Sequence, residues 1–164
     1  MKQKVKFSLF ARILTAVVLV LFVVGIVYIR DNPGKLIFFC VLIGIMTLSG
    51  IYFCPVSIEA DGKGITLHRL MGFSARFAYR DMISAETCYP SAAGIRLCAS
   101  GGFFGYWGYF NDIMLGTYVG CYGDRNHCFL IKFANKQPYV IGCENPTEMV
   151  EFINKHIEEC SDQA

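Results

Sequence analysis

The chain has 164 residues, of which 54% are hydrophobic and only 17% are charged. Globular domains carry about 25% charged residues, so part of this chain is more apolar than a water-exposed domain. The formal net charge of +2 is too small to predict a nucleic-acid partner. The length suffices for one modest domain and an additional segment.

Two long uncharged segments occupy the first third of the chain. Residues 13–29 read ILTAVVLVLFVVGIVYI, and residues 36–53 read LIFFCVLIGIMTLSGIYF. As helices, each would span roughly 25 to 27 Å, close to the hydrocarbon thickness of a bilayer. RDNPGK lies between them as a turn signal, and the lack of a small-residue cleavage site before residue 30 argues against a signal peptide. We predict a transmembrane helical hairpin that makes residues 1–54 a membrane anchor.

Charges around these spans predict their orientation. Four basic residues precede the first span and two lie in the turn: Lys2, Lys4, Lys6 and Arg12 against Arg30 and Lys35. This bias favours a cytoplasmic N-terminus, and two spans return the chain to the cytoplasm. Neither span contains Asp, Glu, Lys, Arg or His, residues that transport pathways normally need. We therefore expect an anchor rather than a conduit.

Residues 55–164 have the pattern of a β-rich domain. Seven short strands are expected from alternating apolar and polar residues: 56–60, 65–70, 75–79 continued in 83–88, 94–99, 116–122, 128–133 and 139–143. The first two should form a hairpin around the turn DGKG, and the fifth and sixth should form another around residues 123–127.

A single helix is predicted at the end of the chain, over residues 146–158. Asn145 can cap it, Pro146 suits its first position, and Glu148 stands where a capping-box carboxylate belongs. The apolar residues that follow recur at helical spacing. Such a helix would close one opening of a curled sheet or small barrel.

This order of elements resembles the pleckstrin-homology (PH) architecture, and residues 54–158 are similar to the bacterial PH-domain family. The resemblance rests on GGFFGYWGYF, LGTYVGCYGDRNHCFLIKF and YVIGCENPTEMVEFI. Members of that family often carry two transmembrane helices before the domain. The resemblance implies an α+β fold, in which a seven-stranded antiparallel sheet or barrel is followed by a C-terminal helix. It also implies a bacterial inner-membrane location, but no particular reaction.

The residue types that carry catalysis are scattered. The eight cysteines contain no CxxC pair, and the three histidines fall on separate predicted elements. We therefore expect buried or half-buried thiols, no metal, no cofactor and no catalytic residues. An enzyme would require a spatial cluster of histidines with cysteines or carboxylates that the sequence does not indicate.

The first predicted hairpin turn is where phosphoinositide-binding PH domains of eukaryotes carry several basic residues. Here Lys63 stands alone beside Asp61, and one lysine does not make a multi-donor phosphate clamp. We expect no specific phosphoinositide binding. Lys63 and Arg69 remain candidates for a weak contact with anionic headgroups.

The stretch GGFFGYWGYF, residues 101–110, concentrates glycines and aromatic residues. Alternation along a strand would place its side chains in two sets: Phe104, Tyr106 and Phe110, and Phe103, Trp107 and Tyr109. One set must lie outside the core of the sheet, and we take Phe103, Trp107 and Tyr109 as a candidate interaction surface. Three roles stay open for it: internal packing, contact with a protein partner or second copy, and contact with the membrane interface.

The sequence thus predicts a membrane-anchored cytoplasmic PH-like domain that acts as a non-catalytic interaction or self-association module. The alternative hypothesis is a module that responds to lipid headgroups at the membrane surface. An enzyme is the least favoured hypothesis.

Overall fold

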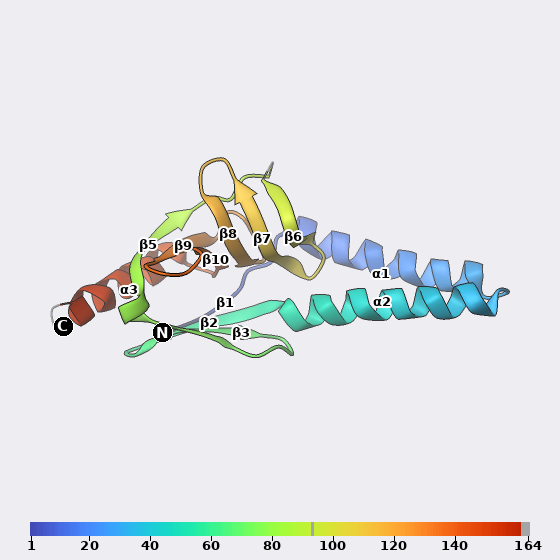
Figure 1. Cartoon of the computed structure of the whole chain (residues 1–164), viewed down its shortest axis with the longest axis horizontal. Coiled ribbons are helices and arrows are strands. Elements are labelled where there is room, and N and C mark those ends of the chain that lie inside the picture. The colour runs from blue at the N-terminus through green and yellow to red at the C-terminus, as the bar shows by residue number, and fades with distance from the viewer. Residues whose placement is uncertain (93, 162–164) are drawn as a thin grey trace.

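The computed structural model describes residues 1–92 and 94–161. Two antiparallel helices, α1 (Leu9–Ile29) and α2 (Pro33–Phe53), extend from one end of a β-rich domain (Figure 1). Asn32 caps α2 by accepting a hydrogen bond of 3.3 Å from the Lys35 N–H. The apolar stretches of α1 and α2 have mean hydropathies of 2.7 and 2.4, and only 6% of each stretch is buried. Both helices are confirmed, and both are long and apolar enough to cross a membrane.

The strands of the domain form two sheets. The first has the order β1-β2-β3-β4: β1 (Lys2–Lys4), β2 (Pro55–Asp61), β3 (Gly64–Arg69) and β4 (Ala75–Ala78). The second has the order β5-β9-β10-β8-β7-β6: β5 (Met82–Cys88), β6 (Ile95–Gly102), β7 (Gly105–Asp112), β8 (Gly116–Tyr122), β9 (Cys128–Phe133) and β10 (Tyr139–Gly142). Every pairing is antiparallel except that of β10 with β8.

The described residues thus form ten strands, whereas the sequence predicted seven. The additional strands are β1 and β7, and the predicted third strand divides into β4 and β5. A short 3-10 helix, η1 (Tyr79–Asp81), separates those two strands and carries the chain from the first sheet to the second. The α+β class, with two apolar helices, mainly antiparallel sheets and a terminal helix, is as expected.

The prediction that residues 116–122 and 128–133 pair as a hairpin is wrong. β10 lies between β8 and β9, so that Val140 faces Gly120 on one side and Leu130 on the other. The segment after β8 therefore spans the width of a strand instead of making a tight turn. It is held by the N-terminal segment, because the Ser8 N–H donates to the Gly123 carbonyl at 3.0 Å.

The N-terminal residues contribute to the β-rich domain as well as to the helical hairpin. β1 pairs with β2, and the terminal ammonium of Met1 donates to the Ala60 carbonyl at 2.6 Å. The segment 1–54, expected only as an anchor, therefore supplies an edge strand. Because β1 precedes α1 and β2 follows α2, both ends of the helical hairpin lie on the same side.

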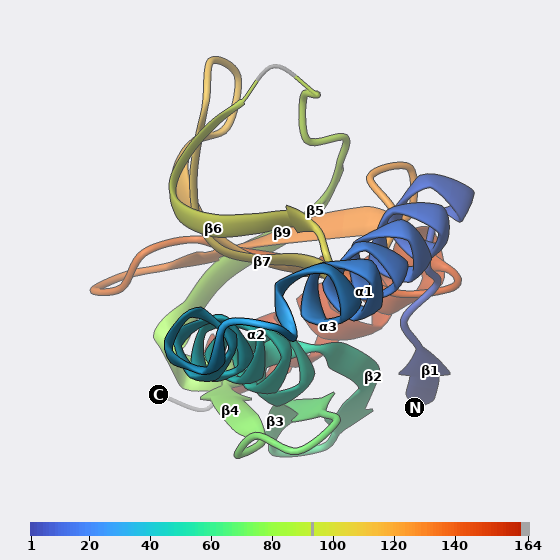
Figure 2. The ribbon, with the colours of Figure 1, turned by 90° about the vertical axis from the view of Figure 1, so that its right-hand side faces the viewer.

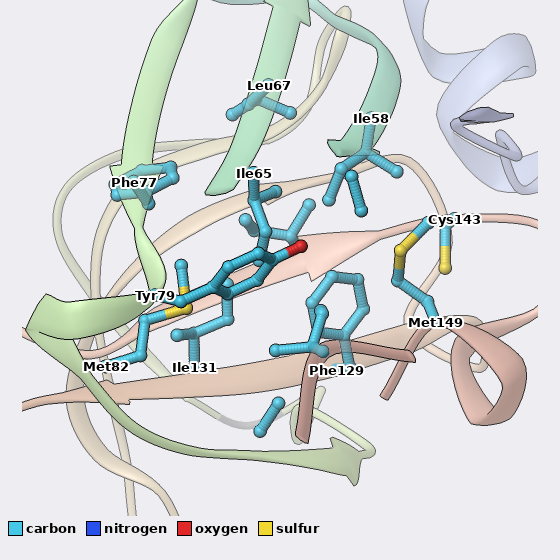
Figure 3. Packing of buried hydrophobic residues seen from close by; sticks show 14 of the residues in the cluster. Ile58, Ile65, Leu67, Phe77, Tyr79, Met82, Phe129, Ile131, Cys143 and Met149 are labelled. Atoms are coloured by element: carbon cyan, nitrogen blue, oxygen red, sulfur yellow. The ribbon is translucent and has the colours of Figure 1, made fainter. Parts of the chain in front are cut away.

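The main core lies between the two sheets and is closed by α3 (Pro146–Ser161). Figure 3 shows side chains of the first sheet meeting those of the second sheet and α3, including Ile65, Phe129 and Met149. The helix cap predicted at Asn145 is confirmed, because Asn145 Oδ1 accepts from the Glu148 N–H at 3.5 Å. The carboxylate half of the predicted capping box is not formed: the Asn145 N–H donates to Gln3 Oε1 at 2.8 Å, and Glu148 Oε2 accepts from Asn145 Nδ2 at 3.2 Å. α3 thus covers the core, as its apolar spacing predicted.

Candidate functional site

The aromatic stretch is a hairpin tip rather than one continuous strand. β6 ends at Gly102, Phe103 and Phe104 form the turn, and β7 begins at Gly105. Gly102 and Gly105 have φ values of +125° and +92°, which favour glycine, and Phe104 itself has a φ of +53°. A left-handed residue other than glycine costs about 1–2 kcal/mol, so neighbouring contacts must hold Phe104 in place.

The neighbouring contacts come from the apolar helices. In the view along the helices, the end of β6 lies beside α1 (Figure 2). The hydroxyl oxygen of Thr15, on α1, accepts a hydrogen bond of 3.0 Å from the Phe104 N–H. The same hydroxyl lies 2.8 Å from the Ala11 carbonyl and 3.3 Å from the Gly102 carbonyl. The hairpin tip is therefore bonded to the first turns of α1.

Packing joins the same tip to both helices. The Phe103 ring lies 6.2 Å from the Phe22 ring of α1 in an edge contact and 4.9 Å from the Phe104 ring. On α2, Gly50 leaves the space that Phe104 occupies, because a Cβ there would lie 2.6 Å from Phe104 Cδ2. The hairpin thus rests on both helices: against the last turn of α2 and, through Phe103, past the midpoint of α1.

Trp107 secures the end of α2. Its ring stacks on Phe53, with centroids 5.0 Å apart and planes 21° from parallel, and its indole N–H donates to the Phe103 carbonyl at 3.2 Å. The Arg69 guanidinium lies 5.5 Å from the centroid of the same Phe53 ring. Stacked aromatic pairs contribute about 0.5–1.5 kcal/mol beyond the area that they bury, so Trp107 and Phe53 hold the β-rich domain against α2.

The structure divides the predicted interaction surface. Phe103 and Trp107 contact the helices, whereas Tyr109 is 50% exposed. Tyr106 and Phe110 are buried together, as alternation predicted, but Phe104 lies in the turn and packs on α2. The alternation fails there because the chain reverses direction at residues 103–104.

The two candidate lipid-contact residues lie at opposite ends of β3. Lys63 is in the turn after β2, and the seven residues of β2 separate it from α2 by roughly 23 Å. Backbone N–H groups of Lys63 and Gly64 donate to Asp61 and hold the pKa of that carboxyl below its usual value. Arg69 lies beside α2 on Phe53. The structure does not bring the pair together.

An apolar loop beside α2 was missed by the sequence analysis. Between β3 and β4, the side chains of Leu70, Met71 and Phe73 are exposed. A hollow of about 380 Å³ lies between Met71 and the last turns of α2, lined also by Leu48, Ser49, Tyr52 and Phe53. The signal was the apolar run LMGF between Arg69 and Ser74, which strand alternation does not explain.

The cysteines and histidines differ in exposure and in their neighbours. Five cysteines are buried, but Cys40, Cys98 and Cys160 are exposed, contrary to expectation. Burial raises the pKa of Cys88 and of Cys143 to about 12, so both remain neutral thiols. Within residues 1–92 and 94–161, no group of three or more His, Cys, Asp or Glu side chains is placed to hold a metal ion.

His127 and Cys128, adjacent in sequence, both contact Asp124. His127 Nδ1 lies 2.9 Å from Asp124 Oδ2, and the Cys128 thiol donates to the Asp124 carbonyl at 3.0 Å. Burial raises the pKa of Cys128 well above its usual value. Asp124 therefore organises the loop between β8 and β9.

Comparison with known proteins adds no family assignment. No family model, curated protein or solved structure matches this chain. The resemblance to bacterial PH domains therefore stays a prediction, and function must be argued from the residues themselves.

Proposed function

We propose that α1 and α2 anchor a cytoplasmic PH-like domain in a bacterial inner membrane, and that this domain is a non-catalytic self-association module. Support for the anchor comes from the exposed apolar surface of both helices. Support for the cytoplasmic side comes from the basic residues before α1. The docked aromatic hairpin holds the domain at a constant orientation to the bilayer.

The observation that carries self-association is the free edge of the second sheet. β6 is eight residues long, and within the described chain no strand pairs with its outer side. Its residues Ile95 and Leu97 are 66% and 59% exposed, and Tyr109 of the neighbouring strand is half exposed. A long apolar edge strand is a template for pairing with another strand.

A second copy of the chain is the occupant that we assign to this edge. All copies would be inserted in the same orientation, and confinement to one membrane raises their effective concentration. Two-fold pairing of β6 with β6 would place the same apolar residues on both sides of the interface. Tyr109, the remaining exposed member of the predicted aromatic surface, would lie beside this contact.

Cys98 supplies a native probe of this contact. It is exposed and lies near the middle of β6, so two-fold pairing would bring two copies of it together. In a chain with Cys40 and Cys160 changed to Ser, mild oxidation in membranes should give a disulfide-linked dimer. Leu97→Lys should abolish the crosslink, because a charged edge residue opposes strand pairing.

The matched control is Ile83→Lys, which places the same charge on an exposed residue of β5, the opposite edge of the same sheet. This variant should crosslink as the parent does. A parent that stays monomeric, or equal loss of crosslinking in both lysine variants, would refute self-association through β6.

A lipid-responsive module is the second candidate, favoured by the apolar loop of Leu70, Met71 and Phe73 beside α2. Phe73→Trp in a Trp107→Phe background should be quenched by brominated lipids. Ile113→Trp in the same background is the control, because this exposed residue lies beyond the far end of β7. Equal quenching at both positions, or none at residue 73, would exclude insertion of the loop.

A further inference from the structure

A second hollow lies beside the start of α1, away from the apolar loop between β3 and β4. It has a volume of about 450 Å³. The first turn of α1, β6, β7 and the loop after β8 contribute its walls, which include Ser8, Phe10, Arg96, Tyr106 and Arg125. Two cations from distant parts of the chain therefore meet at one cavity.

Arg125 is held in place by aromatic rings. Its guanidinium carbon lies 4.7 Å from the centroid of Tyr106, which stacks on Tyr122 at 5.0 Å. The Nε atom of Arg125 is buried and has no hydrogen-bond partner among the described residues. A buried donor without a partner is costly, and an anion in the hollow would be positioned to accept from this guanidinium.

Arg96 approaches the hollow from β6. Its guanidinium lies over Gly101, where a Cβ would be 2.2 Å from the guanidinium carbon. Any larger residue at position 101 would displace Arg96. Within the described part of the chain, neither Arg96 nor Arg125 forms an ion pair with a carboxylate.

The one acidic side chain that lines the hollow, Asp124, bonds to residues of its own loop. Asp124 Oδ1 accepts from the Asn126 N–H at 3.2 Å, and Asp124 Oδ2 contacts His127 Nδ1 at 2.9 Å. These contacts hold the carboxylate against its own loop. The two guanidiniums outnumber this one carboxylate, so the charged side chains that line the hollow are positive on balance.

The height of the hollow along α1 identifies the ligand class. Ser8 caps α1 through the Ala11 N–H, and the apolar surface of the helix starts at Leu9. Phe10, which is 60% exposed, lies at the hollow and at the start of this apolar surface. In a membrane, this level is where the hydrocarbon layer meets the lipid phosphates.

We propose that this hollow binds the phosphate group of an anionic membrane phospholipid. Arg96 and Arg125 donate to the phosphate oxygens, a geometry for which guanidinium groups are well suited. Phe10 packs against the start of an acyl chain that continues along α1. The site rests on the membrane anchorage proposed above, and its Arg96 lies on β6, the strand to which self-association is assigned.

The test compares lipid selectivity of the full chain in liposomes, with spin-labelled phosphatidylglycerol and spin-labelled phosphatidylcholine as probes. The parent should prefer the anionic probe, and the double variant Arg96→Gln with Arg125→Gln should lose about tenfold in that preference. The control is Lys63→Gln with Arg80→Gln, which removes the same charge at the end of the domain away from the helices. The control should keep the selectivity of the parent.

Each other outcome overturns the assignment. Equal loss of selectivity in both double variants would mean that diffuse charge attracts the lipid, and a parent without preference would mean that the hollow binds no headgroup. Displacement of the labelled lipid by millimolar inorganic phosphate would assign the hollow to a soluble phosphate instead. Resistance of the parent and both variants to carbonate extraction tests the anchorage separately, so its failure is distinguishable from failure of the site.

Discussion

Thr15→Val tests whether the aromatic hairpin holds the domain to the helices. Valine keeps the shape of threonine but removes the hydroxyl that accepts from the Phe104 N–H at 3.0 Å. The contact of 3.3 Å with the Gly102 carbonyl is lost as well. The bond of the same hydroxyl to the Ala11 carbonyl is local to the helix and contributes little.

The expected loss of docking free energy follows from the Phe104 N–H, which has no acceptor in the Thr15→Val variant. Leaving a buried donor unsatisfied costs about 1–3 kcal/mol, and the Phe104 N–H bond is part-buried. A middle value of about 2 kcal/mol corresponds to a roughly 30-fold increase in the equilibrium for undocking, since about 1.4 kcal/mol is tenfold. The Phe104 amide should exchange its hydrogen faster by a similar factor.

Hydrogen exchange measured on the full chain in lipid nanodiscs provides the assay. Thr47→Val is the matched control: it makes the same change on α2, where the Thr47 hydroxyl is buried and has no hydrogen-bond partner among the described residues. This control should leave exchange near Phe104 unchanged. Unaltered exchange in Thr15→Val, or equal acceleration in both variants, would refute the docking argument.

Three further experiments test the packing. Gly50→Ala should destabilise the docking of the hairpin on α2 by about 1–3 kcal/mol, because the added Cβ would lie 2.6 Å from the Phe104 ring. The emission of the single tryptophan should then shift to the red. Gly44→Ala is the control, since a Cβ there has nothing within 4 Å and should cause neither change. At pH 8, Cys98 should react with maleimide, whereas Cys128, whose burial raises its pKa, should react only after denaturation; rapid native labelling of Cys128 would contradict its burial. Asn154→Ala should lower the free energy of unfolding by about 1–3 kcal/mol, since it removes two bonds of 2.9 Å to the backbone of β5; an unchanged denaturation midpoint would show that α3 docks without them.

Several elements could be predicted from the sequence because their signals are local. The uncharged runs of 13–29 and 36–53 predicted both helices, although α1 begins earlier, at Leu9. Asn145 predicted the start of α3, because an N-cap accepts from a backbone N–H within the first helical turn. Local hydrogen bonding and hydrophobic periodicity determine such elements almost without reference to the rest of the chain.

The residues that meet at the candidate sites are set by the order of strands in the sheets, and local sequence patterns do not specify that order. No periodicity in KQK predicted that residues 2–4 would pair with β2, and nothing near β8 indicated that β10 would separate it from β9. The aromatic stretch could be read as a surface because its partners lie far away in the chain, about 90 residues earlier on α1 and about 50 residues earlier on α2. Arg96 and Arg125 likewise meet only because β6 and the loop after β8 both reach α1. The amino-acid sequence alone determined which segments are apolar and where α3 starts, because these signals are local. Long-range pairing and packing decided which aromatic and charged side chains lie together.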